Sequence, residues 1–117
     1  MNITMLKSKI HRATVTDADL NYEGSISIDP GLLDAAKIMP FERVEIYNVN
    51  NGERFATYAI LGKEGEICLN GAAARLVHKG DIVIIASFGS YTREEATAHV
   101  PTLVYVTEKN RMKDKKG

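Results

Sequence analysis

The bond between Gly24 and Ser25 carries the most informative chemistry in the chain. If the Ser25 hydroxyl attacks the Gly24 carbonyl, the amide becomes an ester, and elimination followed by hydrolysis leaves a pyruvoyl group in place of Ser25. That ketone is an electrophile that no encoded side chain supplies. Glycine suits the position before the bond, because without a Cβ it can adopt backbone conformations with φ > 0 that aim its carbonyl at the hydroxyl. A Gly-Ser pair is also common in ordinary turns, so its neighbours must decide between the two interpretations.

Two pairs of polar residues could hold an acidic substrate. Lys9 and His11 are two positions apart, so on an extended strand they face the same side and offer a cation and a polar donor to a carboxylate. Arg54 and Tyr58 are four positions apart and also share a face. Arg binds a carboxylate through two parallel hydrogen bonds, whereas Lys is a mobile point charge. The combination suits a dicarboxylate, although each cation alone could be ordinary surface charge.

The segments around these residues resemble the pyruvoyl-dependent L-aspartate 1-decarboxylases in order and spacing. The resemblance is strong from about Met5 to Phe88, weakens through Tyr105 and says little about the rest. It implies conversion of L-aspartate to β-alanine and CO2, for pantothenate and coenzyme A synthesis, by a proenzyme that cleaves itself. It also implies a cytoplasmic homotetramer with sites near subunit interfaces, and it allows for a protein that promotes maturation. The matching segments are KIHR (9–12), DLNYEGS (19–25), NGERFATYAI (51–60), NGAAA (70–74) and GDIVIIASF (80–88).

The resemblance implies roles for Ser25, Thr57 and Tyr58. Ser25 becomes the pyruvoyl group that forms a Schiff base with the substrate, Thr57 assists self-processing and contacts substrate, and Tyr58 returns a proton after CO2 departs. A phenol suits that last role because it stays protonated at neutral pH. Adjacent strand residues point to opposite faces, so Thr57 and Tyr58 can serve one site only at a bulge, a strand end or a subunit interface. We favour the interface.

The remaining matches imply a substrate-binding group. A turn of small residues lets the backbone approach the substrate closely, and successive N–H groups at a helix start favour an anion. Asn70 could orient the site through its side chain, and Tyr22 could pack over the cleavage loop. The residues expected to bind substrate are Lys9, His11, Arg54, Thr57, Gly71, Ala72 and Ala73.

Decarboxylation of an amino acid needs an electron sink, because loss of CO2 leaves a carbanion. A pyruvoyl ketone condensed with the substrate amine is such a sink. A chain of 117 residues is much shorter than folds that envelop pyridoxal phosphate, so we do not expect that cofactor. We expect no metal either, because His11, His78 and His99 are far apart and have no Cys or carboxylate at ligand spacing.

The composition argues against several partners. Fifteen basic and fifteen acidic residues cancel, which leaves no electrostatic footprint for nucleic acid or an anionic membrane. No apolar run approaches membrane-spanning length and no signal peptide is recognisable, so we expect a cytoplasmic protein. The lone Cys68 cannot form an internal disulfide, and its apolar neighbours favour a buried, inert residue over a nucleophile.

The elements that must position these residues are mostly strands, because the dominant hydrophobic period is two. Asn51 and Gly52 tolerate φ > 0 and predict a hairpin between residues 44–49 and 53–60. Other expected strands cover residues 25–28, 82–86 and 102–107.

Three short helices interrupt the strands. Asp29 can cap the first, with Pro30 at its first helical position and Leu32, Leu33 and Ala36 facing inward. Asn70 or Gly71 can open the second over residues 72–76. Thr92 and Glu95 have capping-box spacing for the third, which ends before Pro101.

We therefore predict a mainly β protein, and the resemblance specifies a small six-stranded double-psi β-barrel with short helices. Residues 1–107 form one catalytic domain, cleaved between Gly24 and Ser25. Residues 108–117 have almost no apolar surface to bury and are expected to be a disordered polar tail. The alternative is a non-enzymatic β-barrel interaction module that does not cleave itself, since fold does not dictate function.

Overall fold

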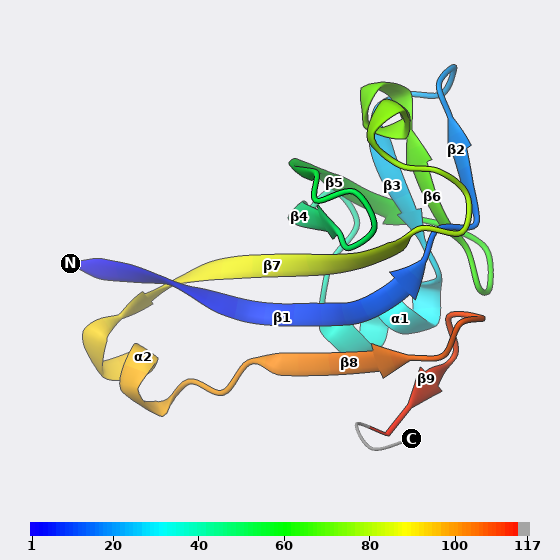
Figure 1. Ribbon diagram of the computed structural model, residues 1–117. Coiled ribbons are helices and arrows are strands. Elements are labelled where there is room, and N and C mark those ends of the chain that lie inside the picture. Colours follow the sequence, from blue (N-terminus) through cyan, green and yellow to red (C-terminus); the bar gives the residue numbers. More distant parts are fainter. Residues whose placement is uncertain (115–117) are drawn as a thin grey trace.

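The computed structural model describes residues 1–114. Within that range the chain forms nine strands, two short α-helices and one 3-10 helix (Figure 1). No helix of this part of the chain is long and apolar enough to cross a membrane. The strands are β1 (Asn2–Thr14), β2 (Asp17–Asp19), β3 (Ser25–Ile28), β4 (Arg43–Asn48), β5 (Arg54–Leu61), β6 (Ile67–Asn70), β7 (Ile82–Thr92), β8 (Thr102–Val106) and β9 (Met112–Lys113). The helices are α1 (Pro30–Ala36), the 3-10 helix η1 (Gly71–Leu76) and α2 (Arg93–Ala98).

The strands follow one continuous hydrogen-bonded order, β2-β6-β3-β5-β4-β7-β1-β8-β9. Sequence neighbours β4 and β5 pair as the predicted antiparallel hairpin, whereas β3 pairs parallel to β5 and β1 parallel to β8. The mainly β class with few short helices, consistent with a small barrel, is confirmed. The described residues form nine strands rather than six, and the short strands β2 and β9 lie at the two ends of the strand order. The double-psi crossing stays a prediction.

The core lies between the strands and consists mainly of aliphatic side chains. Ile26 and Ile28 of β3, Val44 and Ile46 of β4 and Ile85 of β7 have no exposed surface. In β3 and β4 these residues alternate with more polar ones, which is the period of two in the sequence, because successive strand residues point to opposite faces. The core therefore fixes which face of β3 is left for the chemistry.

The predicted helix starts are confirmed in two cases and modified in the third. Asp29 caps α1 by accepting a hydrogen bond from the Gly31 N–H at 2.6 Å, and Thr92 and Glu95 form the capping box of α2. The second helix is a 3-10 helix whose Asn70 makes no side-chain cap. Its amide instead donates hydrogen bonds to two serine hydroxyls of β3. The Asn70 side chain therefore joins the end of β6 to β3.

The prediction of a disordered tail over 108–117 is wrong for residues 108–114. β9 pairs with β8, and Asn110 is only 1% exposed. The Asn110 side chain accepts a hydrogen bond from the Thr14 N–H and donates to the carbonyls of Thr14 and Gly65. One polar side chain thus holds a segment that has little apolar surface. The remaining three predicted tail residues, 115–117, lie outside the described residues.

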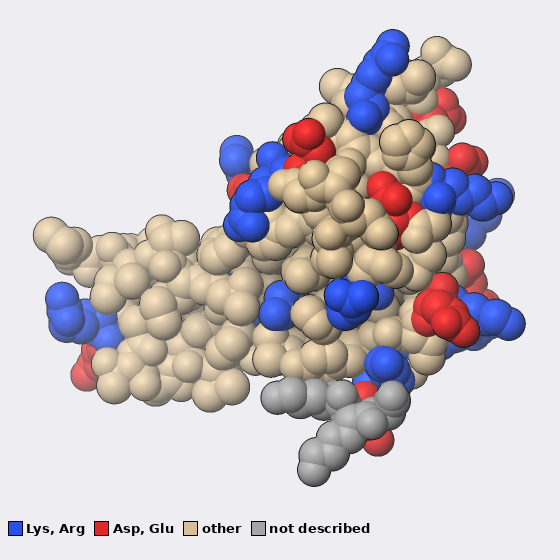
Figure 2. Space-filling view, viewed as in Figure 1, with Lys and Arg blue, Asp and Glu red and all other residues tan. Residues whose placement is uncertain are grey.

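One end of the molecule projects away from the other strands (Figure 1). It consists of the start of β1, the end of β7 and α2, and the face shown in Figure 2 carries few charged side chains there (Figures 1 and 2). Exposed apolar residues on these elements and on the chain that follows α2 include Phe88, Val100 and Leu103, at 44%, 81% and 41% exposure. Such a concentration of exposed apolar side chains is typical of an interaction surface.

Candidate active site

Ser25 is the first residue of β3 and has no exposed surface. It pairs with Asn70 at the end of β6, and the Asn70 Nδ2 donates a hydrogen bond to the Ser25 Oγ at 3.0 Å. The Ser25 hydroxyl in turn donates to the Glu23 carbonyl at 2.9 Å. The nucleophile of the predicted cleavage is therefore buried and held by two partners. One of them, Asn70, is 45 residues away from Ser25 in the sequence.

Four polar residues share one face of the β3–β6 pair. Ser25 lies opposite Asn70 and Ser27 lies opposite Cys68, while the other face carries the pairs Ile26–Leu69 and Ile28–Ile67. All four polar side chains are buried, and we call them the polar quartet: Ser25, Ser27, Cys68 and Asn70. The alternation of β3 thus separates a reactive face from a core face.

Gly71 packs directly against the residue before the cleavage bond. Its φ is +66°, and a Cβ at this position would lie 2.7 Å from both the Cα and the N of Gly24. Gly24 itself lies outside the positive-φ region, and a Cβ there would meet nothing within 4 Å. Gly71, and not Gly24 as the sequence suggested, is therefore the glycine that adopts φ > 0 beside the cleavage bond.

A hollow of about 260 Å³ opens beside the cleavage bond. Four predicted site residues line it together: Gly24, Thr57, Ala72 and Ala73. They come from the β2–β3 loop, β5 and η1, so the fold brings together three segments that are far apart in sequence. The hollow is small and open, and its other lining residues are Phe55, Ala56 and Leu76, so a small molecule would meet a mainly apolar wall.

Tyr58 belongs to a neighbouring hollow. It lines a space of about 260 Å³ with Arg43, Ala56 and Thr57, so Thr57 borders both hollows. The parallel pairing of β3 with β5 begins at Ile26 and Ala59, and Ser25 and Tyr58 are the residues that directly precede this pair. The prediction that an interface lets Thr57 and Tyr58 serve one site stays a prediction.

Of the predicted substrate-binding residues, Lys9, His11, Arg54 and Gly71 do not line the hollow beside Gly24. The Arg54 guanidinium lies 4.0 Å over the ring of Tyr47, and Lys9 lies on β1 between Ala86 of β7 and Leu103 of β8. β1 is separated from β3 in the strand order by β5, β4 and β7. A single chain therefore presents these cations outside the hollow that contains Gly24 and Thr57.

His11 lines a larger hollow of about 470 Å³ on the β1–β8 side, with Arg12 and Tyr105 among its neighbours. Burial lowers the pKa of His11, and the nearby positive charges of Lys9 and Arg12 lower it further. Its Nδ1 is buried without a hydrogen-bond partner among the described residues. His11 is thus kept neutral at physiological pH, as a donor or acceptor rather than a cation.

Tyr22 is 56% exposed and lies over the polar face of β3 and β6. It borders a polar hollow together with Ser27, Cys68 and Asn70. Its carbonyl is also one of the atoms that crowd Gly71. The prediction that Tyr22 packs over the cleavage loop stays a prediction.

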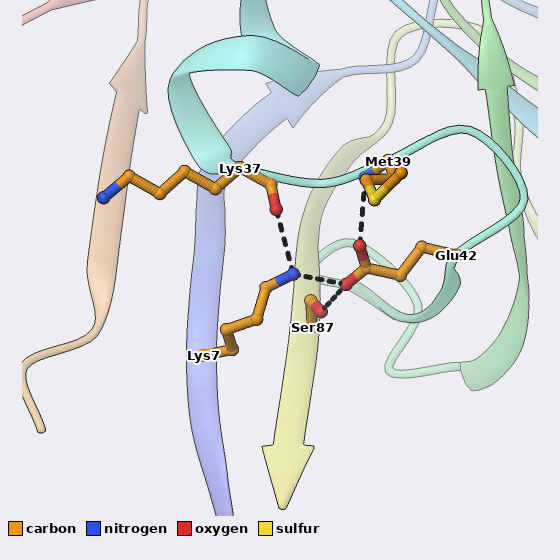
Figure 3. Close-up of polar contacts among 5 residues, drawn as sticks. All are labelled: Lys7, Lys37, Met39, Glu42 and Ser87. Atoms are coloured by element: carbon orange, nitrogen blue, oxygen red, sulfur yellow. Dashed lines mark hydrogen bonds and ion pairs between the residues drawn. The ribbon is translucent and has the colours of Figure 1, made fainter.

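A network of polar contacts surrounds Glu42 in the loop between α1 and β4 (Figure 3). The Glu42 carboxylate accepts hydrogen bonds from Lys7 Nζ at 2.7 Å, from the Met39 N–H at 2.9 Å and from the Ser87 hydroxyl. Burial alone would raise the pKa of Glu42, but these bonds and the charge of Lys7 together lower it. Glu42 therefore joins β1, β7 and the α1–β4 loop as an ionised group.

The backbone of the same loop holds β5 directly. The Ala59 N–H donates to the Glu42 carbonyl at 3.0 Å, and the Phe41 N–H donates to the Ala59 carbonyl at 2.6 Å. Ala59 follows Tyr58, whose ring lies 6.3 Å from that of Phe41, centroid to centroid. The position of Tyr58 thus depends on a loop that Glu42 anchors.

The family model described as aspartate decarboxylase matches residues 1–113. The chain belongs to the aspartate decarboxylase family. It is 60% identical to an aspartate 1-decarboxylase of Bdellovibrio bacteriovorus over 116 residues, 99% of this chain and 94% of that protein. It is 64% identical to one of Syntrophus aciditrophicus over 115 residues, 97% and 99% of the two chains. The resemblance found in the sequence motifs is therefore confirmed.

The structure adds two residues to the site that sequence reasoning missed in this family member. Ser27 accepts a hydrogen bond from Asn70 Nδ2 at 3.1 Å, and the Cys68 Sγ donates to Asn70 Oδ1 at 3.3 Å. The signal was the shared spacing of two, Ser25 with Ser27 and Cys68 with Asn70, which places each pair on one face of its strand. Their apposition, however, requires the β3–β6 register. Among the described residues, no three His, Cys, Asp or Glu side chains gather as a metal site would require.

Proposed function

We propose that this protein converts L-aspartate to β-alanine and CO2 with a pyruvoyl group made from its own Ser25, and so supplies pantothenate and coenzyme A synthesis. The observation that carries the proposal is the fully buried Ser25 side chain with the Asn70 amide donating to its hydroxyl at 3.0 Å. This placement fits a reactive hydroxyl that is held by protein partners rather than by solvent. Membership of the aspartate decarboxylase family supports the substrate.

Self-processing is proposed to begin at the bond between Gly24 and Ser25. The Ser25 Oγ bonds to the Gly24 carbonyl carbon, the C–N bond breaks, and the hydroxyl proton passes to the Ser25 nitrogen. Because that hydroxyl now donates to the Glu23 carbonyl, it must first turn toward Gly24. Thr57 borders the same hollow as Gly24 and is the residue that we propose to stabilise the negative oxygen by a hydrogen bond. Elimination then frees Gly24 as a carboxylate, and water displaces the residue-25 nitrogen as ammonia.

The chain's own side chains would bind and protonate the substrate. The pyruvoyl ketone supplies the sink for the electrons that CO2 leaves behind. Tyr58 is the proposed donor of the returning proton. Arg54 is the proposed ligand of the distal carboxylate, because stacking on Tyr47 uses the face of its guanidinium and leaves its N–H edge available. No pyridoxal phosphate or metal enters this proposal.

A homotetramer with sites near its interfaces is part of the proposal. Lys9 and His11 do not line the hollow beside Gly24, so a neighbouring copy is the natural source of these side chains. The weakly charged projecting end offers an apolar surface for such an assembly (Figure 2). We propose a cytoplasmic location, where a free thiol such as Cys68 persists.

Intact mass spectrometry tests the proposal. We expect the purified protein to mature into a fragment of residues 1–24 and a fragment of residues 25–117 that is lighter by one ammonia than its encoded sequence. The mature protein should release CO2 from L-aspartate and far less from L-glutamate, whose extra methylene misplaces the distal carboxylate. Ser25→Ala should abolish both cleavage and CO2 release, whereas Ser90→Ala, at an exposed serine of β7 outside the site, should still cleave.

Two results would overturn the proposal. The first is a parental chain that stays intact after long incubation and after addition of an extract of its source organism, which would contain any protein that promotes maturation. That outcome would favour the non-enzymatic interaction module. The second is a Ser25→Ala protein that still releases CO2 from aspartate, because it would show that no group derived from Ser25 is needed.

A further inference from the structure

The Asn70 amide is held in one orientation by three hydrogen bonds within the polar quartet. Its Nδ2 donates to Ser25 Oγ at 3.0 Å and to Ser27 Oγ at 3.1 Å, and its Oδ1 accepts from Cys68 Sγ at 3.3 Å. Asn70 is only 3% exposed. Because oxygen and nitrogen of an amide have the same shape, the partners and not the packing decide which of them faces Ser25.

The thiol of Cys68 is the partner that distinguishes the two ends of this amide. The Ser27 hydroxyl can donate or accept, so it tolerates either orientation. Burial raises the pKa of Cys68 to about 11, and the negative charges of Glu66, Asp17 and Asp19 also raise it. The thiol therefore stays protonated at neutral pH and acts as a donor, which requires the oxygen of Asn70 on its side.

We propose that Cys68 is a positioning residue for self-processing: its S–H fixes the Asn70 amide so that the NH2 group faces the Ser25 oxygen. This inference rests on the proposed function, because it concerns the cleavage at Ser25. It assigns a role to a cysteine that its apolar sequence neighbours indicate to be inert. Cys68 itself touches neither the cleaved bond nor the substrate and acts only through Asn70.

The orientation matters most when the ester breaks. In the ester, Ser25 Oγ is bonded to the Gly24 carbonyl carbon and to the Cβ of residue 25. The Cβ–Oγ bond then breaks, the proton on Cα passes to water, its electron pair forms the Cα=Cβ bond, and Oγ leaves as part of the Gly24 carboxylate. A hydrogen bond from Asn70 Nδ2 to Oγ stabilises the negative charge that develops on this oxygen.

A flipped Asn70 would work against this step. Its Oδ1 would face the ester oxygen, which has no proton to donate, and two acceptors would oppose each other in a buried space. Removal of the Cys68 donor makes the flip accessible, because either orientation then leaves the end of the amide that faces residue 68 without a partner. The predicted consequence is an ester that forms but breaks slowly.

Three variants of the full-length protein test the inference. Cys68→Ala and Cys68→Val remove the donor with a smaller and a larger side chain, and Cys68→Ser keeps a donor. Cleavage is followed by intact mass, and the ester is measured as the fraction of uncleaved chain that hydroxylamine splits at residue 24. We expect Cys68→Ala and Cys68→Val to cleave about tenfold more slowly, which is the effect of one hydrogen bond of ordinary strength. Both variants should accumulate hydroxylamine-sensitive chain. Cys68→Ser should cleave within about twofold of the parental rate.

The comparison remains decisive if one variant is unstable. Thermal unfolding by circular dichroism identifies the variants that fold. If Cys68→Ala does not fold, the comparison of Cys68→Val with Cys68→Ser still isolates the effect of the hydrogen-bond donor. The inference is overturned if both donor-free variants cleave at the parental rate. It is also overturned if Cys68→Ser cleaves as slowly as the donor-free variants. Failure of the parental protein to cleave would instead refute the proposed function, so the two failures are distinguishable.

Discussion

Replacement of Gly71 by alanine tests how closely the chain packs beside the cleavage bond. The added Cβ would lie 2.7 Å from the Cα and the N of Gly24, and both are backbone atoms that cannot rotate away. The φ of +66° adds strain, because L side chains disfavour this region. Either residue 71 or the loop around Gly24 must move, so the substitution should affect both stability and cleavage.

The expected loss of stability has two parts. Backbone strain at φ > 0 costs about 1 to 2 kcal/mol, partly offset by about 0.4 to 1 kcal/mol from the stiffer unfolded chain. The steric overlap adds about 1 to 3 kcal/mol, as overpacking in a tight interior does. Gly52→Ala is the matched control, because Gly52 has a φ of +79° and nothing within 4 Å of its added Cβ. The difference between the two variants isolates the contact with Gly24, at about 1 to 3 kcal/mol.

Urea unfolding measures this difference in the Ser25→Ala background, where the chain stays in one piece. Circular dichroism is the suitable signal because the chain has no Trp, and all samples are compared at one protein concentration in case they assemble. With Ser25 restored, Gly71→Ala should slow cleavage on the order of 10²-fold, as a displacement of about 1 Å can do. The reasoning is refuted if Gly71→Ala is no less stable than Gly52→Ala and cleaves at the parental rate.

Two further predictions concern β5 and its support. Tyr58→Phe should cleave normally but have a kcat lower by roughly 10² to 10⁴, whereas Thr57→Val should fail first at cleavage. Intact mass paired with single-turnover CO2 release separates the two effects. A parental rate of CO2 release in Tyr58→Phe would show that Tyr58 is a packing residue. Because the pKa of Glu42 is lowered in the folded state, the ionised carboxylate stabilises the fold at pH values above its ordinary pKa of 4.5. This stabilisation is lost as the pH falls through the lower pKa of the folded state. Glu42→Gln should therefore lose about 1 to 3 kcal/mol at pH 7 and less in acid, by unfolding at each pH. Glu64→Gln is the control, because the Glu64–Arg111 ion pair is exposed and should contribute little to the free energy of unfolding. Equal losses of stability in the two variants would contradict the role of Glu42.

The sequence by itself determines the features that depend on neighbours a few positions apart. The Asn51-Gly52 hairpin, the Asp29 cap of α1 and the Thr92–Glu95 capping box all form as predicted, since each needs only local backbone geometry. The alternation of β3 likewise predicts that Ser25 and Ser27 share a face. The family could be identified for the same reason, because its motifs are short continuous segments.

Only the tertiary structure decides which of these faces meet. Periodicity orients a side chain within its own strand but does not set the register between strands, which depends on the packing of the whole core. That register places Asn70 opposite Ser25 and Cys68 opposite Ser27, so a cysteine with apolar neighbours in sequence becomes part of the polar quartet. The same long-range packing presses Gly71 against Gly24 and buries Asn110 between Thr14 and Gly65. These contacts join residues tens of positions apart, where local sequence patterns carry no information about distance.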